Sequence, residues 1–231
     1  MEIPCKLILI LIFILNTSFF SMNCLAANSQ CSGSRSNGSI KGAIQIPVKG
    51  KNFVINHSFI DKLGRNYVHS KVYDVILDSY ENLFILNPEI KFKYAETAWK
   101  QGGDFYPHKT HQNGLSVDFM VPVFDENKQS VYFTSDSTNK FGYGLDFNKS
   151  GKYKNLEINF NALALHLVEL HKSALRNNIE IERVIFAPEF RRLLFKTKLG
   201  NYLQKNLTFM KNKAWVRHDE HYHIDFAVKC K

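Results

Sequence analysis

Two short stretches decide how this chain folds and what it does: HKTHQNGLSVD at residues 108–118 and HDEHYH at residues 218–223. The chain has 231 residues and nine histidines, and five of the histidines fall within these two stretches. Each stretch runs into a segment with the alternating pattern of a β-strand, residues 115–123 and residues 221–228. Histidines gathered where strands begin indicate a metal or catalytic site.

The alternation of side chains along a strand gives the two stretches a common face. His221 and His223 point to one side of their strand, whereas Tyr222 points to the other. Asp118 lies on the segment that we expect to be the partner strand, and Gly114 lets the chain bend just before it. If these strands are neighbours, two imidazoles and one carboxylate converge on a single position.

Such a group of side chains suits a zinc ion. Neutral imidazoles and carboxylates are zinc ligands, and three protein ligands with an open fourth position are typical of catalytic sites. A water in the open position has its pKa lowered to about 7, which provides a hydroxide nucleophile at neutral pH. His111, in the turn before the first strand, adds a further imidazole. The pattern therefore predicts metal-assisted hydrolysis of an amide or ester.

The other four histidines have no comparable pattern. We interpret them as surface or partly packed positions on helices and loops: His57, His69, His166 and His171.

The remaining pattern predicts an α+β fold, with a small central antiparallel sheet that carries the zinc site and is flanked by helices. Helical spacing predicts one helix that begins at Ser70 and stops before Asn87, and a second helix over residues 159–176. We also expect a short helix over residues 189–201, strands at residues 43–48, 92–97 and 181–187, a lead-in loop over residues 27–42, and a polar surface insertion over residues 125–154.

The N-terminal segment has the pattern of a secretory signal peptide. Residues 7–15 form an uninterrupted apolar run, and small residues follow at positions 24–27. We predict a signal peptide over residues 1–26 and a single zinc metallopeptidase domain over residues 27–231. The apolar run is shorter than the roughly 20 residues that span a bilayer, so we expect no stable membrane insertion after cleavage; an uncleaved anchor is the alternative.

Cleavage after residue 26 leaves two of the four cysteines, Cys31 and Cys230, near opposite ends of the mature chain. In an oxidising compartment this pair predicts one disulfide bond that ties the two ends together.

The net charge of +9 favours a partner that carries many carboxylates. The same charge would suit nucleic acid, but the chain has no motif of interleaved aromatic and basic residues, so we expect no nucleic-acid binding. The sequence does not predict an oligomeric state.

The two histidine stretches resemble the metallopeptidase clan that joins lysostaphin-type peptidases, D-alanyl-D-alanine peptidases and the hedgehog signalling domain. The shared pattern is His-x6-Asp followed far downstream by His-x-His. More closely, the chain resembles the penicillin-insensitive murein endopeptidases. Four segments carry this closer similarity and span most of the mature chain in order: residues 36–42, 102–118, 184–188 and 215–223.

The resemblance implies a zinc ion held by His111, Asp118 and His223. It implies that His221 acts beside the metal, where it orients the attacking water or stabilises the oxyanion. The implied reaction is hydrolysis of the peptide cross-link of bacterial peptidoglycan between D-alanine and diaminopimelate, in the periplasm.

The resemblance further implies that His108 and His218 line the cleft as substrate-binding groups, and that a second ion could sit near His108. One position leaves the chemistry open. Glu220 lies three residues before His223, and in the D,D-carboxypeptidase and dipeptidase branch a glutamate at that spacing is the general base. In the endopeptidase branch a histidine has this role, and regular strand alternation turns Glu220 away from His223.

Two other functions therefore stay open at this point. One is a zinc D,D-carboxypeptidase or dipeptidase on the same scaffold, and the other is a metal-containing binding module without catalytic activity.

Overall fold

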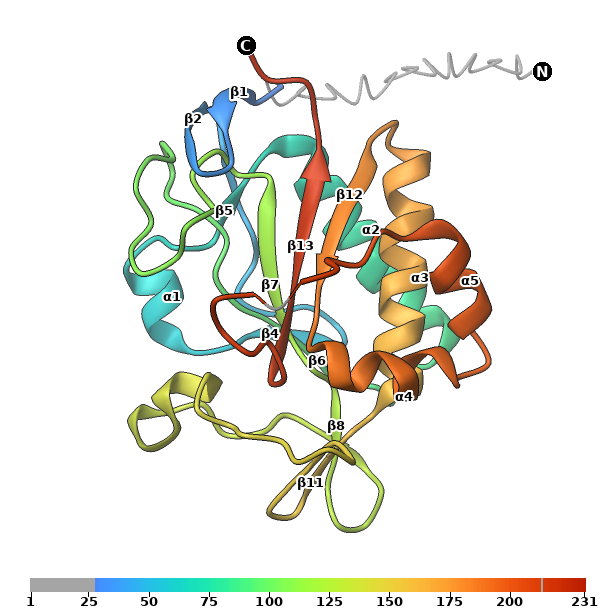
Figure 1. The fold of residues 1–231 in the computed structure, drawn as a ribbon. Coiled ribbons are helices and arrows are strands. Elements are labelled where there is room, and N and C mark those ends of the chain that lie inside the picture. Colours follow the sequence, from blue (N-terminus) through green and yellow to red (C-terminus); the bar gives the residue numbers. More distant parts are fainter. Residues whose placement is uncertain (1–27, 213) are drawn as a thin grey trace, which may run out of the picture.

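The computed structural model describes residues 28–212 and 214–231, so the predicted signal peptide lies outside the described residues. At its centre is a five-stranded sheet (Figure 1). The strands follow the order β12 (Glu180–Ile185), β13 (His221–Ala227), β7 (Ser116–Met120), β6 (Phe92–Tyr94) and β4 (Phe53–Ile55). Helices flank this sheet, and the predicted α+β class is confirmed.

The sheet departs from the expected antiparallel arrangement at one edge. The pairs β12–β13, β13–β7 and β7–β6 are antiparallel, but β4 and β6 are parallel. Between these two strands the chain forms α1 (Ser58–Lys62), β5 (Tyr67–Val68) and α2 (Ser70–Leu86). A crossover connection of this length returns the chain in the same direction, which is how a parallel pair arises.

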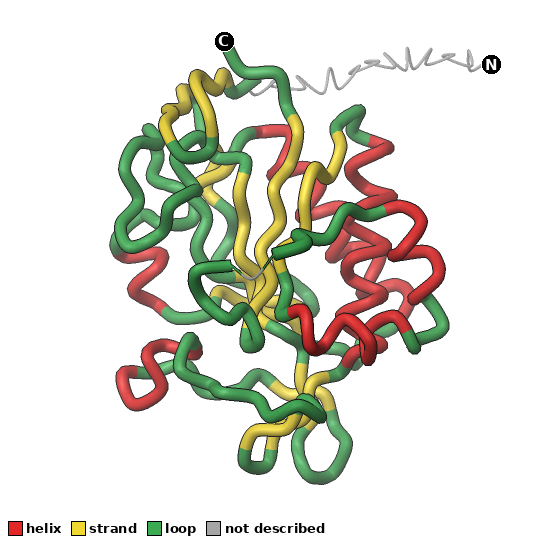
Figure 2. The backbone as a smooth tube through the Cα atoms, viewed as in Figure 1, coloured by secondary structure: helices red, strands yellow, loops and turns green. Residues whose placement is uncertain are grey.

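Two long helices gather on one side of the sheet (Figure 2). They are α2 and α3 (Phe160–Arg176), which pack against each other, and both agree with the helices expected from the sequence. No helix in the described part of the chain combines the length and the apolarity that a membrane crossing requires.

The expectation for His166 was wrong, because this residue of α3 is completely buried. It follows Leu163 by three positions and precedes Leu170 by four, so it belongs to the apolar face of the helix. The Nδ1 atom of His166 hydrogen-bonds to the hydroxyl of Tyr222, whose side chain points away from the other histidines of β13. The helical layer thereby contacts the back of the strand that carries His221 and His223.

The basic segment expected as one short helix consists of three pieces. They are a 3₁₀ turn η2 (Pro188–Phe190), α4 (Arg191–Phe195) and α5 (Gly200–Asn206). Thr197 ends α4, since its hydroxyl donates to the Leu194 carbonyl, one of the last free carbonyls of that helix.

Residues 123–158 form a second, four-stranded sheet with the order β10 (Lys152–Tyr153), β11 (Leu156–Ile158), β8 (Val123–Phe124) and β9 (Ser130–Val131). The 3₁₀ segment η1 (Ser137–Gly142) lies between β9 and β10. The expected surface insertion is only partly on the surface, because Phe133, Leu145 and Phe147 are buried in the core.

The lead-in region expected as a loop forms a hairpin of β1 (Gln30–Ser34) and β2 (Asn37–Lys41). Each strand has one buried residue, Cys31 and Ile40, so an alternating apolar pattern could not reveal it. The hairpin is held from outside its own sequence: Cys31 forms a disulfide bond with Cys230, and the Lys231 amide donates to the Cys31 carbonyl. The last short pair is β3 (Ile44–Gln45) with β5.

We predict that the double variant Cys31→Ser/Cys230→Ser unfolds at lower urea concentration than the wild type. The bond closes a loop with a sequence separation of 199 residues, and in the chain-entropy model such a cross-link stabilises by about 5 kcal/mol. Urea unfolding followed by circular dichroism measures the loss. Reductant should lower the wild-type midpoint and leave that of the double variant unchanged; equal midpoints for both proteins would contradict the prediction.

Candidate metal centre

The centre is built on the pairing of β13 with β7. In this antiparallel pair His223 lies directly opposite Asp118 and His221 lies opposite Met120. The Nδ1 atom of His223 is 2.8 Å from Asp118 Oδ1. Tyr222 and Phe119 stack on the other face of the sheet, with ring centroids 5.5 Å apart. The predicted division of the two strands into a polar face and a core face is therefore confirmed.

His111 reaches Asp118 from the loop before β7. Its backbone is in the left-handed region, with φ of 71°, and its ring stacks on Phe105. Nδ1 of His111 donates to the carbonyl oxygen of Thr97 at 2.6 Å, which leaves Nε2 without a proton. This Nε2 atom lies 3.4 Å from Asp118 Oδ1. The backbone thus fixes both the orientation and the tautomer of a completely buried imidazole.

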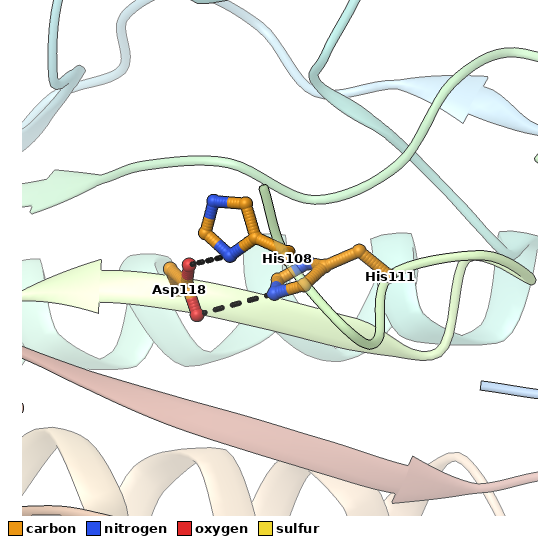
Figure 3. A group of neighbouring side chains, drawn as sticks. All are labelled: His108, His111 and Asp118. Carbon is orange, nitrogen blue, oxygen red and sulfur yellow. Dashed lines mark ion pairs between the residues drawn. The ribbon is translucent and has the colours of Figure 1, made fainter. Parts of the chain in front are cut away.

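His108 approaches the same carboxylate from its other oxygen (Figure 3). Its Nε2 atom is 2.6 Å from Glu96 Oε2, and its Nδ1 atom is 3.7 Å from Asp118 Oδ2. One ligand atom from each of His108, His111 and Asp118 lies within 4.8 Å of the others, so these three residues could hold a metal ion. The sequence suggested a different third ligand, His223, and the structure brings both histidines to Asp118.

Two buried atoms of this cluster make no hydrogen bond within the described part of the chain, His111 Nε2 and Asp118 Oδ2. Leaving buried polar atoms unpaired is costly, and a bound cation would satisfy both. Imidazole nitrogens and a carboxylate form the donor set that zinc prefers, so the residues present fit a metal ion of this type.

A second carboxylate, Asp225, holds His223 from behind. Its Oδ1 atom is 2.8 Å from His223 Nε2 and accepts a hydrogen bond from Ser116. Burial alone would raise the pKa of Asp225, but His223 and these hydrogen bonds keep it below the usual range. Burial alone would lower the pKa of His223, yet the two carboxylates raise it to about 9. A metal ion at Nδ1 would compete with one of these protons.

Glu220 contacts His221 and not the expected ligand. Its Oε1 atom accepts a hydrogen bond of 2.9 Å from Nδ1 of His221, and its Oε2 atom accepts one from the Asp219 amide. Glu220 is buried, with only 6% of its surface exposed. Burial disfavours the charged form of His221, but Glu220 outweighs burial and raises the pKa of His221.

His218 packs beside His221, with ring centroids 4.4 Å apart. Its Nδ1 atom donates to the Val216 carbonyl at 2.9 Å, and burial lowers its pKa to about 4, so the ring is neutral at neutral pH.

These side chains share a pocket of about 680 Å³. Its walls come from the loop at residues 107–110, from residues 143–146 after η1, and from residues 214–218 before β13. The pocket lining includes every residue assigned to the site from sequence except His111, which lies beneath it and is fully buried. A volume of this size suits part of a peptide or a small ligand.

Three residues of the site were missed from sequence. Asp225 could have been predicted from the sequence, because it follows His223 by two positions and so lies on the same face of the strand. Glu96 and Tyr143 gave no signal of this kind: Glu96 lies just past the end of β6, and Tyr143 is held over His221 by a loop, with ring centroids 5.1 Å apart.

The chain is similar to one family of known proteins. A family model described as penicillin-insensitive murein endopeptidase matches residues 31–231, which is nearly all of the described chain. A search among curated proteins gave no match. The resemblance drawn from the four sequence segments is thereby confirmed.

We predict that Asp225→Asn weakens zinc binding by roughly 10- to 100-fold, because a neutral amide accepts the His223 Nε2 proton more weakly than the carboxylate does and leaves Nδ1 of the ring a poorer electron donor. Competition between the protein and a chromophoric chelator measures the affinity. Asp146→Asn is the matched control, since this carboxylate also lines the pocket but its side chain is 83% exposed. An unchanged affinity in a folded Asp225→Asn protein would show that Asp225 does not support the metal centre.

Proposed function

This chain belongs to the penicillin-insensitive murein endopeptidase family, and we propose that it is a zinc endopeptidase that hydrolyses D-alanyl-diaminopimelate cross-links in peptidoglycan. The observation that carries the proposal is the convergence of buried imidazoles on Asp118 at the wall of a pocket, with His111 Nε2 and Asp118 Oδ2 unpaired. We further propose that residues 1–26 direct the chain to the periplasm, where an oxidising environment fits the disulfide bond.

The proposed zinc ligands are Nε2 of His111, Nδ1 of His223 and the carboxylate of Asp118. In each imidazole the other nitrogen is engaged by a protein acceptor, Thr97 or Asp225, which supports this choice of atoms. When bound, zinc supplies a Lewis acid and an activated water. His108 would then remain a substrate-binding group or hold a second ion.

His221 is the proposed catalytic histidine. Since Nδ1 of His221 donates to Glu220, its Nε2 atom is free to orient water or to stabilise the developing oxyanion. Glu220 is a positioning residue in this scheme, because it acts through the ring that it orients, as the aspartate does in a Ser-His-Asp triad.

Basic side chains at the pocket rim support an anionic peptide as the substrate. Lys109 and Lys140 line the pocket and have no carboxylate partner among the described ion pairs. Cross-linked peptides of peptidoglycan carry free carboxylates, which such cations attract. His218 lies on the same wall and is the proposed second substrate-binding histidine.

The placement of Glu220 also bears on the alternative function. A D,D-carboxypeptidase or dipeptidase would use Glu220 itself as general base. The hydrogen bond from His221 occupies Oε1 of Glu220, and the Asp219 amide occupies Oε2, so this geometry favours the endopeptidase.

We predict that His111→Ala, Asp118→Ala and His223→Ala each lose tightly bound zinc, because each removes a ligand from a three-ligand site. His108→Ala is the variant that distinguishes the two possible ligand sets, because His108 also lies close to Asp118. This variant should keep one zinc ion per chain. Metal content after dialysis, measured by atomic emission, decides between the two ligand sets. Loss of zinc in His108→Ala with retention in His223→Ala would overturn the assignment.

We predict that the wild-type protein releases monomers from cross-linked muropeptide dimers and releases no free D-alanine. His221→Ala should keep its metal and lose roughly 10²- to 10⁴-fold in turnover, the usual contribution of a general acid or base. Glu220→Gln should lose less, because its amide oxygen can still accept the His221 Nδ1 proton.

Product analysis by chromatography separates the outcomes. Equal losses in Glu220→Gln and His221→Ala, together with release of D-alanine, would favour the carboxypeptidase. No cleavage by a fully metallated wild-type protein would favour a binding module without catalytic activity.

A further inference from the structure

A second pocket of about 460 Å³ adjoins the pocket of the metal centre. The two pockets share four wall residues, Glu96, Pro107, Lys140 and Tyr143. Glu96 faces both, because it also holds His108 of the metal centre. A molecule that extends out of the first pocket across this wall therefore enters the second.

The second pocket is lined mainly by aromatic and aliphatic side chains. Phe59, Leu63 and Tyr106 are 49%, 60% and 88% exposed, which is unusual for large apolar residues that lie together. The ring of Phe141 lies 5.6 Å from that of Phe59 and 4.7 Å from that of His57. The result is an open aromatic surface rather than a closed core.

The inner wall of this pocket is held in place by buried polar groups. Lys140 and Phe141 have left-handed backbone conformations, with φ of 51° and 57°. Asn56 donates to the Phe141 carbonyl at 2.7 Å and accepts a hydrogen bond from the Ser135 hydroxyl. The buried amine of Lys93 in turn donates to Ser135 at 2.6 Å. This chain of hydrogen bonds fixes the wall before any ligand binds.

The lining of the second pocket has few unpaired charges. Arg65 and Glu96 form an ion pair with each other, so Lys140 is the remaining charged side chain of the lining. Aromatic faces with few charges at the rim suit a flat, uncharged ring whose C–H groups face one side and whose polar groups face water.

We propose that this second pocket binds an N-acetylated sugar ring of the glycan to which the cleaved stem peptide is attached. The inference rests on the proposed function, because a stem peptide joins the cross-link to the sugar in peptidoglycan. A stem peptide of four residues in extended conformation spans roughly 13–14 Å. One substrate can therefore place its cross-link in the first pocket and its sugar in the second, since the two pockets share a wall. Phe59 and Tyr106 are the most exposed aromatic side chains of the lining, and they offer the faces on which such a ring would stack.

The test compares two muropeptide dimers with the same cross-link, one with disaccharides on its stem peptides and one with the sugars removed. The wild-type protein should cleave the sugar-bearing dimer with a KM lower by roughly fivefold or more, which is the expected effect of one or two aromatic stacking contacts. Phe59→Ala and Tyr106→Ala should each raise this KM, leave kcat unchanged, and leave the peptide-only dimer unaffected.

The matched control is Ile85→Ala, which removes a 69% exposed apolar side chain of α2 that lines neither pocket. It should behave as the wild type with both dimers. Equal KM values of the wild type for the two dimers would overturn the sugar pocket and leave the proposed endopeptidase intact.

A second measurement does not depend on cleavage. The free disaccharide of N-acetylglucosamine and N-acetylmuramic acid, titrated into the zinc-loaded protein, should perturb tryptophan fluorescence or NMR signals, and Phe59→Ala should abolish the effect. If neither muropeptide dimer is cleaved but the disaccharide binds in this way, the proposed endopeptidase function is wrong and the proposed sugar pocket is supported. Absence of disaccharide binding, or a concentration-dependent dimer of the chain that Phe59→Ala dissociates, would overturn the sugar pocket.

Discussion

The candidate metal centre depends on the register between β13 and β7. His223 lies directly opposite Asp118 in this pair, and both side chains point away from the helical layer. A slip of one residue would turn His221 and His223 into the core and bring Tyr222 to the metal face, because side chains alternate along a strand. The core opposes such a slip: Tyr222 stacks on Phe119 and hydrogen-bonds to His166 of α3. The buried back of the sheet therefore sets the position of the polar front.

A second constraint is that each imidazole of the pocket and of the cluster around Asp118 has one nitrogen engaged by a fixed acceptor. The acceptors are backbone carbonyls for two of the rings and carboxylates for the other three: Thr97 for His111, Val216 for His218, Glu96 for His108, Glu220 for His221 and Asp225 for His223. The opposite nitrogen of each ring is then directed by the protein rather than by solvent. This arrangement holds five imidazoles without free rotation. It also accounts for the three carboxylates, Glu96, Glu220 and Asp225, that lie around the cluster in addition to Asp118.

The sequence predicted those parts of the site that lie on regular strands. Alternation along residues 115–123 and 221–228 correctly placed Asp118 and His223 on one face, and the same rule would have found Asp225. Strand alternation could not predict where His108 lies relative to His223, because His108 is in a loop, where side chains follow no regular alternation. Both residues reach Asp118. The sequence pattern also missed the β1–β2 hairpin, whose strands are held by the disulfide bond and by the C-terminal backbone, and the buried position of His166, which sits in a helical stripe of leucines. In each case the missing information was a contact between distant segments.

The walls of the two pockets have a different origin from the metal centre. Much of each wall comes from segments outside the central sheet, and η1 contributes two consecutive residues, Lys140 and Phe141, in a conformation that favours glycine. Such a conformation persists only where the surroundings enforce it, and here Asn56, Ser135 and Lys93 do so from the sheet side. Burial of the Lys93 amine is unfavourable in itself, and hydrogen bonds to the Phe133 carbonyl and the Ser135 hydroxyl offset this cost. The left-handed backbone at Lys140 and Phe141 and the buried amine of Lys93 are both unfavourable, and both shape the same wall. This fits a wall that contacts substrate, because a loop that only connected β9 to β10 would need neither feature.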